Sequence, residues 1–326
     1  MRRAHSRQFP LTHSRAPLPK LGGLLFIVAL AVGCSRSRAL ASAATPPQPP
    51  AVEFIGEWGT AGSDPGQLND PVGPAVDDSG RVFLADRGTE SVDKFEANGV
   101  PLLSFEDPSI RGTDAISVDY GGGIYLADLR VGTMRIFFPE GDFLRAFHIA
   151  PQRDWAGPFR FSVDEGGKVF VPDPAGGRIV VLDSHGKLER AWKVSPASAG
   201  APSRPSMAVA APDGAIYVGD WQAGRIVKYS SEGAPMPGWQ DAAAPAAPLL
   251  GLAVSSKFLF ALRDAAPRLQ IWTLDGRLKM SDDLGGRLDA PSPSKASLGV
   301  NPSGDLVVLN PAGPRILRFR IHLDSP

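Results

Sequence analysis

The amino-acid sequence predicts an all-β fold, a six-bladed β-propeller of four-stranded antiparallel blades. One strand pattern recurs six times after residue 50, and its valines lie 42, 45, 46, 45 and 46 residues apart. That interval is typical of one propeller blade. Turns rich in Gly, Asn and Asp separate the short strands, as antiparallel sheets require. The repeated valines are Val76, Val118, Val163, Val209, Val254 and Val300.

The first repeat contains four predicted strands, at residues 73–77, 81–86, 91–96 and 101–105. Each is short and apolar or alternating, and a turn containing Gly separates the first pair and the last pair. Later repeats match the first repeat in its first three strands. The segments that match the first two strands and the turn between them are SVDYGGGIYLAD, SVDEGGKVFVPD, AVAAPDGAIYVGD, LAVSSKFLFAL and LGVNPSGDLVVLN. The segments that match the third strand are MRIFF, GRIVVL, GRIVKY, RLQIW and PRILRF.

The two ends of the chain predict how the ring closes. The sixth repeat stops after its third strand, Arg315 to Leu323, so its outer strand is missing. A spare strand, Val52 to Trp58, precedes the first repeat and resembles the outer strands of other repeats. We therefore expect this N-terminal strand to pair into the last blade, closing the propeller and covering an edge open to aggregation.

The first 33 residues are predicted to be a signal peptide. A basic stretch up to Lys20 precedes the apolar run from Leu21 to Gly33, and these 13 residues suit a signal-peptide core but are too few for a membrane-spanning helix. The chain's one cysteine, Cys34, follows in a sequence that resembles a bacterial lipobox. Residues 34–50 are then an Ala/Ser/Pro-rich tether, and residues 51–326 are the propeller.

Lipid attachment at Cys34 has an alternative, which is ordinary signal cleavage near Ala41 or Ala43. Both interpretations predict export. The first places the protein on a bacterial membrane, with Ser35 after the cysteine favouring the outer membrane, and the second makes it soluble in the periplasm or secreted. A single cysteine cannot form a disulfide within the chain, so stability must come from packing.

Charge argues against nucleic acid as a partner. The chain has 34 basic and 34 acidic residues, but five basic residues lie before residue 21. Without them, 29 basic residues face 34 acidic ones. A net-negative body lacks the clustered cations that nucleic-acid binding needs. A closed propeller also exposes no obligatory edge, so we predict no obligatory oligomer.

The repeat P-x-G-x-A-V-D-x-x-G-x-V-[FY]-[LV]-A-D-x-x-x-x-R-I-x-x-[FY] resembles that of the NHL-repeat family of six-bladed propellers. The resemblance covers roughly residues 52 to 322 and is most specific in the first four repeats. The fifth repeat departs from it, because Leu262 stands where the pattern has Asp, and the sixth has Asn310 there. The resemblance implies a propeller that either binds a partner or, as in related lyases and gluconolactonase-like enzymes, holds a channel metal.

A ring of polar residues ends the second strand of five repeats, and an arginine follows five residues later in three of them. We predict a structural role, in which the carboxylate or amide bridges the next loop and accepts hydrogen bonds from arginine or loop backbone. A polyvalent cation site is the alternative. The ring comprises Asp86, Asp128, Asp173, Asp220 and Asn310, and the arginines are Arg178, Arg225 and Arg315.

Enzymatic residues are hard to find in this sequence. His148, His185 and His322 fall on outer strands, outer turns or the C-terminal tail, where they cannot converge on a channel metal. No serine or cysteine nucleophile motif is visible. We therefore predict no catalytic residue, no metal ligand and no cofactor. A metal site made of carboxylates alone stays open, because Asp114 lies just before an inner strand.

One face of the propeller is predicted to bind the partner, because it carries the loops before inner strands and after second strands. Arginine and tryptophan are common binding anchors. The face gathers Arg87, Arg111, Asp114, Arg130, Trp155, Phe159, Arg160, Arg204 and Trp221. Among them we expect Arg87, Asp114, Arg130, Arg160 and Trp221 to contact the ligand, whereas Trp155 and Phe159 have packing between blades as an alternative.

These observations predict an exported, lipid-anchored, non-catalytic binding scaffold at the bacterial cell envelope. Its partner would be an envelope protein, a peptide or a glycan, bound through one propeller face. The alternative is a metal-dependent lyase or lactonase that acts in the central channel. The two differ in the channel: an enzyme needs several polar ligands converging on one ion, and a scaffold does not.

Overall fold

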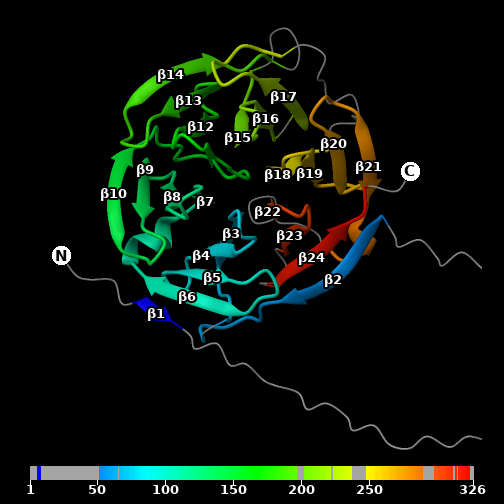
Figure 1. The fold of residues 1–326 in the computed structure, drawn as a ribbon. Coiled ribbons are helices and arrows are strands. Elements are labelled where there is room, and N and C mark those ends of the chain that lie inside the picture. Colours follow the sequence, from blue (N-terminus) through cyan, green and yellow to red (C-terminus); the bar gives the residue numbers. More distant parts are fainter. Residues whose placement is uncertain are drawn as a thin grey trace, which may run out of the picture.

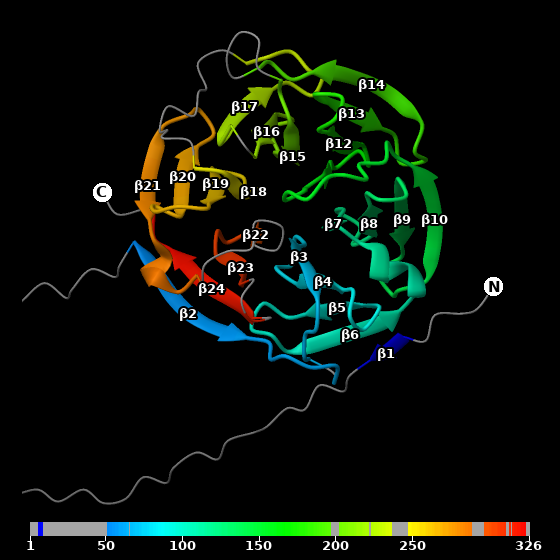
Figure 2. The same ribbon diagram turned by 180° about the vertical axis from the view of Figure 1, so that it is seen from behind.

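A computed structural model describes residues 6–8, 51–64, 66–196, 202–221, 223–236, 247–288, 297–310, 313 and 315–323. Six antiparallel sheets are arranged radially around a central axis (Figure 1), which confirms the predicted six-bladed β-propeller. The view from behind shows the same ring, with the inner strands around the axis and the outer strands on the rim (Figure 2).

The first three blades follow the sequence order from the axis outwards. Blade 1 comprises β3 (Pro71–Val76), β4 (Val82–Asp86), β5 (Ser91–Phe95) and β6 (Pro101–Glu106). The 3-10 helix η1 (Pro108–Gly112) leads to blade 2, with β7 (Ala115–Val118), β8 (Ile124–Asp128), β9 (Thr133–Phe137) and β10 (Phe143–His148). Blade 3 comprises β11 (Ser162–Val163), β12 (Val169–Asp173), β13 (Arg178–Leu182) and β14 (Leu188–Lys193).

The last three blades repeat this order with one difference in blade 4. Its described strands are β15 (Pro205–Ala210), β16 (Ile216–Asp220) and β17 (Arg225–Tyr229), and a bridge from Tyr229 to Pro235 stands where its outer strand was expected. Blade 5 comprises β18 (Leu249–Val254), β19 (Phe258–Arg263), β20 (Leu269–Thr273) and β21 (Leu278–Asp282), followed by the 3-10 helix η2 (Leu284–Gly286). Blade 6 comprises β22 (Ser297–Val300), β23 (Leu306–Asn310), β24 (Arg315–Ile321) and β2 (Val52–Trp58).

Strand β2 closes the ring, as the sequence predicts. It pairs antiparallel with β24, and the register places Val52 opposite Ile321 and Trp58 opposite Ile316. The backbone N–H of His322 also donates to the carbonyl of Ala51 at 2.9 Å. The first and last strands of the propeller therefore hold each other, and the β24 edge is covered.

A further short strand, β1 (Ser6–Gln8), pairs with β6 at the outer edge of blade 1. The sequence analysis did not predict a strand there, because these residues belong to the predicted signal peptide. The rest of that segment and the tether at 34–50 lie outside the described residues. Among the residues that are described, no helix is long and apolar enough to cross a membrane.

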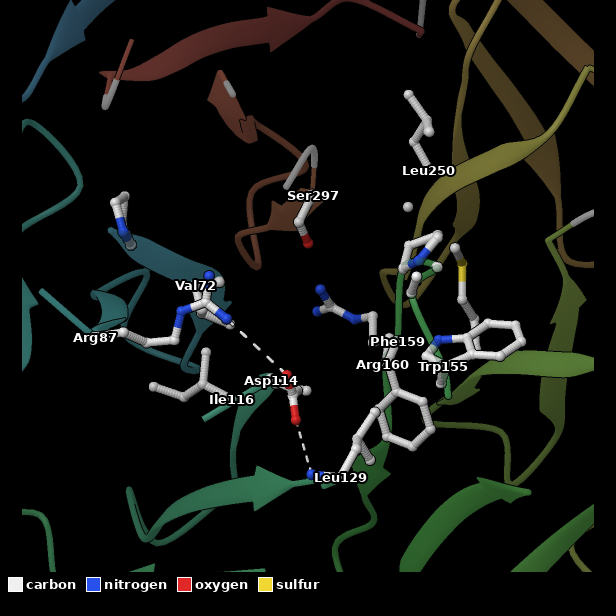
Figure 3. A pocket seen from close by; sticks show the side chains of 18 residues that line it. Val72, Arg87, Asp114, Ile116, Leu129, Trp155, Phe159, Arg160, Leu250 and Ser297 are labelled. Atoms are coloured by element: carbon white, nitrogen blue, oxygen red, sulfur yellow. Dashed lines mark hydrogen bonds and ion pairs between the residues drawn. The ribbon is translucent and has the colours of Figure 1, made fainter. Parts of the chain in front are cut away.

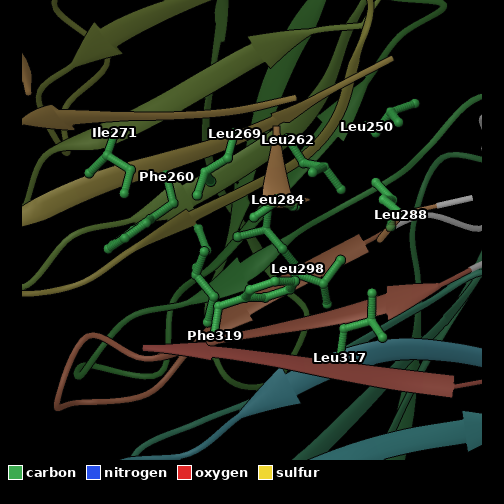
Figure 4. Close-up of a cluster of buried hydrophobic side chains, with 13 residues drawn as sticks. Leu250, Phe260, Leu262, Leu269, Ile271, Leu284, Leu288, Leu298, Leu317 and Phe319 are labelled. Carbon is green, nitrogen blue, oxygen red and sulfur yellow. The ribbon is translucent and has the colours of Figure 1, made fainter. Parts of the chain in front are cut away.

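The hydrophobic core lies between neighbouring blades. The second strands of most blades are buried along their whole length, because both of their faces pack against adjacent sheets. One cluster joins blades 5 and 6 through Phe260, Leu298, Leu317 and Phe319 (Figure 4). Such face-to-face packing fixes each blade relative to the next, and so fixes the loops at the two ends of the channel.

Candidate binding site at the channel mouth

The acidic residues that end the second strands organise the loops of the binding face. Asp86 is fully buried, and its two carboxylate oxygens accept hydrogen bonds from the backbone N–H groups of Asn69 at 2.6 Å, Asp70 at 2.9 Å and Gly88 at 2.9 Å. One side chain thus joins the loop before β3 to the loop after β4. Bonds to an ionised carboxylate are among the stronger hydrogen bonds, so this contact rigidifies both loops.

Asp173 forms the loop bridge with the arginine that the repeat predicts. Its carboxylate accepts from Arg178 Nε at 2.7 Å and from the Gly176 backbone N–H at 2.9 Å. Gln152, which the sequence analysis missed, donates its side-chain N–H at 2.9 Å. Burial acts to raise the pKa of Asp173, but these hydrogen bonds outweigh it and hold the pKa below its usual range.

The remaining members of the ring differ from this arrangement. Asp128 accepts hydrogen bonds from backbone N–H groups of the loop that follows it. Asp220 accepts one from the backbone N–H of Arg204, before β15, and one from that of Ala223, in the loop after β16. In the described part of the chain, the Arg225 guanidinium donates to the Pro196 carbonyl at 3.1 Å and forms no hydrogen bond with Asp220. Asp220 therefore bridges its loop through backbone N–H groups, which is the second of the two kinds of partner that the repeat predicts.

The last predicted arginine holds the closing strand. Arg315 begins β24 opposite Asn310, which is fully buried at the end of β23. Its Nη1 lies 3.3 Å from Glu57 Oε1 on β2. This arginine therefore links the third strand of blade 6 to the strand supplied by the N-terminal end of the propeller.

A cavity of about 120 Å³ opens at the end of the channel on the predicted binding face (Figure 3). Its lining includes Arg87, Asp114, Trp155, Phe159 and Arg160, and we call this end the arginine mouth. Three of the five predicted ligand-binding residues thus come together from blades 1, 2 and 3. The two aromatic residues also pack against the core between blades 2 and 3, as the packing interpretation expects, and a contact of either with a ligand stays a prediction.

Arg160 is positioned by backbone contacts just before β11. Its N–H donates to the Ser206 carbonyl at 2.9 Å, and its own carbonyl accepts from Ala208 at 2.8 Å. Its side chain crosses the channel, where Nη1 donates to the carbonyls of Leu298 at 2.7 Å and Pro74 at 3.4 Å. Burial lowers the pKa of Arg160 to about 10, which still leaves the guanidinium charged at neutral pH.

Arg87 and Asp114 face each other across the arginine mouth. Arg87 Nη2 lies 2.9 Å from Asp70 Oδ2, and its Nη1 lies 4.0 Å from Asp114 Oδ1. The other oxygen of Asp114 accepts from the Leu129 backbone N–H at 2.8 Å. Burial is the main cause that raises the pKa of Asp114, and the Leu129 hydrogen bond opposes it.

Trp221 and Arg130, also predicted to contact a ligand, do not line this cavity. Trp221 packs edge-on against Trp155, with ring centroids 5.6 Å apart. Gly157 permits this contact, because a Cβ there would come within 2.5 Å of the Trp221 ring. The indole nitrogens of both tryptophans are buried and make no hydrogen bond in the described part of the chain. Trp221 therefore supports the wall of the cavity from behind.

Sequence reasoning missed the part of the arginine mouth that blades 4 to 6 supply. Met207, Leu250 and Ser297 come from blades 4, 5 and 6 and also line the cavity. Each occupies an ordinary position in an inner strand, and nothing in the local sequence distinguishes it from a core residue. Only the closure of the ring brings these three residues to the same cavity as Arg87 and Arg160.

The other end of the channel holds a second cavity, of about 430 Å³. Its lining includes Asp77, Asp78, Asp119, Asp164 and Glu165, and no Lys or Arg occurs among the described residues that line it. We call this end the acidic mouth. Burial, together with the charges of Asp77 and Glu165, raises the pKa of Asp78. In the sequence these acidic residues lie in turns between the first and second strands, where acidic residues are common, so the sequence alone does not indicate a shared cavity.

The described residues contain no group of three or more His, Cys, Asp or Glu side chains placed to hold a metal ion. His322 Nε2 lies 3.0 Å from Glu53 Oε2 at the outer edge of blade 6. His185 lies in the turn after β13, and His148 ends the outer strand β10. All three histidines therefore lie away from the channel.

No protein-family model matches this chain, and no curated protein matches it. Solved structures do. A streptogramin B lyase structure is 14% identical with a TM-score of 0.55, covering 83% of this chain and 97% of that one. A catalytically inactive virginiamycin B lyase from Staphylococcus aureus, solved with quinupristin, is 16% identical with a TM-score of 0.52, covering 74% and 78%.

A selenomethionine-substituted virginiamycin B lyase from Staphylococcus aureus is 13% identical, with a TM-score of 0.54, covering 84% of this chain and 90% of that one. Identities this low show a shared fold and nothing about a shared activity. The resemblance of the repeats to the NHL family is not confirmed by a family match. What the comparisons and the structure establish together is the all-β propeller architecture.

Proposed function

We propose that this protein is an exported, lipid-anchored, non-catalytic binding scaffold at the bacterial cell envelope. It binds an envelope protein, peptide or glycan through the face that carries the arginine mouth. The observation that carries the proposal is the gathering of Arg87, Arg160 and Trp155 at one cavity on a rigid ring. Loops held in this way present planar cations and aromatic surface with little loss of conformational freedom on binding.

The polar groups of the arginine mouth are suited to recognition. Asp114 uses one oxygen for the Leu129 backbone, and its other oxygen faces Arg87. Arg160 donates to two strand carbonyls from other blades. Each group is thus fixed in direction before a ligand arrives, as a preorganised binding site requires.

A metal-dependent lyase or lactonase is the second candidate. It is favoured by one observation, the partly buried Asp114 with its raised pKa at the channel mouth, because such perturbed carboxylates are common in catalytic sites. Elemental analysis with melting curves before and after chelation separates the two candidates. A stoichiometric metal whose removal lowers the melting temperature would put the enzyme first.

Site-directed photo-crosslinking in living cells tests the scaffold. A crosslinking residue at Arg111, whose side chain is 76% exposed on the arginine-mouth face, should yield a discrete adduct with an envelope component. The matched control is Leu188, 60% exposed on outer strand β14, which should yield none. Equal labelling from both positions, or none from either, would contradict binding through this face.

Export and lipid attachment are tested in the same strain. The wild-type protein should fractionate with membranes and incorporate labelled fatty acid. Cys34→Ala should abolish the fatty-acid label and should move the protein out of the membrane fraction. Full-length protein with Met1 intact in the cytosol would rule out the export part of the proposal.

A further inference from the structure

The arginine mouth carries a positive charge that the protein does not neutralise. Arg87 is paired with Asp70 and approaches Asp114. For Arg160, no carboxylate within ion-pairing distance is found in the described part of the chain, and its contacts are to two neutral carbonyls. Arg160 is half-buried, so its charge is partly removed from water without a counter-ion, and an anionic ligand would offset the free energy which that costs.

The guanidinium of Arg160 also keeps donors for a ligand. Arginine has five N–H donors in a rigid fork. Its hydrogen bonds within the described part of the chain use only Nη1, and neither Nε nor Nη2 is a buried nitrogen without a partner. These two nitrogens therefore retain access to the cavity that Arg160 lines, and together they match the two oxygens of a carboxylate.

The cavity is small, and apolar side chains form part of its wall beside the polar groups, which contribute the larger share of its exposed surface. Its walls include Ile116, Leu129, Met207, Leu250 and Phe159. A volume of about 120 Å³ is slightly below that of the engineered cavity of about 150 Å³ that accommodates benzene. The space beside the guanidinium therefore suits an apolar group of about four to six heavy atoms.

We propose that the arginine mouth binds a carboxylate borne on a small apolar group, with Arg160 as its counter-ion. The inference rests on the proposed binding function of the same face and adds the chemistry of the ligand. Two sources present this chemistry: a free short-chain or aromatic carboxylic acid, and the C-terminus of a peptide that ends in a branched apolar residue. Asp114, turned to Leu129 and Arg87, borders the site without occupying it.

Calorimetric titration of the purified full chain tests the ligand chemistry. The probes are isovalerate and benzoate, with isovaleramide and benzamide as neutral controls of the same shape. We expect the carboxylates to bind at least tenfold more tightly than the amides. A short peptide ending in leucine is compared in its free-acid and amidated forms, and tighter binding of the free-acid peptide than of isovalerate would assign the peptide as the source.

Two variants connect this binding to the proposed residues. Arg160→Met removes the charge at similar length, and Ser297→Phe fills the cavity while leaving Arg160 in place. Both should weaken carboxylate binding at least tenfold. Arg153→Met is the matched control, because Arg153 is exposed in the loop before β11 and does not line the cavity, and it should bind as the wild type does.

Amides that bind as well as the carboxylates would overturn the inference, as would equal losses in Arg153→Met and Ser297→Phe. If Arg160→Met fails to fold, the amide comparison and Ser297→Phe still decide. If crosslinking from Arg111 succeeds but the protein shows no preference for carboxylates over amides, the proposed binding function is supported and only the proposed ligand chemistry is contradicted.

Discussion

Asp173 shows how a single buried carboxylate stabilises a loop of this propeller. We expect Asp173→Ala to lower the free energy of unfolding by about 2 to 3 kcal/mol, because Arg178, Gln152 and the Gly176 N–H lose a charged acceptor. Denaturant unfolding at pH 7 measures the loss. Asp154→Ala, at an exposed position, is the control and should change stability by less than about 0.5 kcal/mol.

The same residue makes a prediction about pH. The pKa of Asp173 is lower in the folded state than the unfolded value of about 3.9. Its contribution is therefore fully present above that unfolded value and is lost as the pH falls through the folded pKa. The stability gap between wild type and Asp173→Ala should shrink between about pH 5 and pH 2, and a gap independent of pH would contradict the ionic role.

Asp114 should tune anion binding at the arginine mouth. Replacing it with asparagine removes a negative charge beside Arg87, so carboxylate affinity should rise about three- to tenfold. Because burial raises the pKa of Asp114, acidification should strengthen anion binding by the wild type but not by Asp114→Asn. Titration with a sulfonate, which stays ionised in acid, measures this. Asp78→Asn at the acidic mouth is the control and should leave the affinity unchanged.

Individual residues differ in how far their roles can be predicted from sequence. The loop-bridging role of Asp86 and Asp173 follows from repetition, because the first four blades place an aspartate at the same turn. The reach of Arg160 does not follow, because its acceptors on Leu298 and Pro74 are 138 and 86 residues away along the chain. Long side chains that cross a channel depend on closure of the whole ring, which leaves no local pattern.

Among the described strands, β2 is the one that joins the beginning of the propeller to its end, so its packing should matter most for ring closure. Phe54 on β2 packs edge-on against Phe319, with centroids 5.6 Å apart, and the Arg287 guanidinium lies 3.9 Å from the ring centroid of Phe54. We expect Phe54→Ala to cost about 2 to 3 kcal/mol of stability. A thermal melt with light scattering should show earlier aggregation as the β24 edge opens.

The control for that change is Phe143→Ala on outer strand β10. Phe143 also makes an edge contact, to Phe137 at 5.7 Å, but it is 54% exposed and closes no ring. It should cost less than half as much and should not promote aggregation. Equal effects at the two positions would mean that β2 is an ordinary outer strand.

Elements with a regular pattern were predictable, and those without one were not. The missing outer strand of the sixth repeat and the spare strand at residues 52–58 together required the closure that the antiparallel pairing of β2 and β24 provides. The fourth blade shows the limit, since only the bridge to Pro235 marks its outer edge among the described residues. The sequence of strand β1 does not match the repeat, and β1 pairs with the outer edge of β6 through backbone contacts that do not depend on a particular sequence.

At the scale of the whole molecule, the two ends of the channel have opposite electrostatic character. The arginine mouth has two guanidinium groups against one carboxylate, whereas the described lining of the acidic mouth has five carboxylates and no basic side chain. The repeat predicted the ring and which loops share a face. It did not predict this polarity, because the charges come from turn residues that differ in each blade.

The register of β2 determines on which face of the propeller its first strand begins. Val52 lies opposite Ile321, at the end of blade 6 where β22 reaches Val300 and the acidic mouth begins, and Trp58 lies at the opposite end. Residue 51, where the described propeller begins, therefore lies at the end of blade 6 on the side of the acidic mouth. The chain enters the propeller on the face opposite the arginine mouth, so this entry does not crowd the cavity that Arg160 lines.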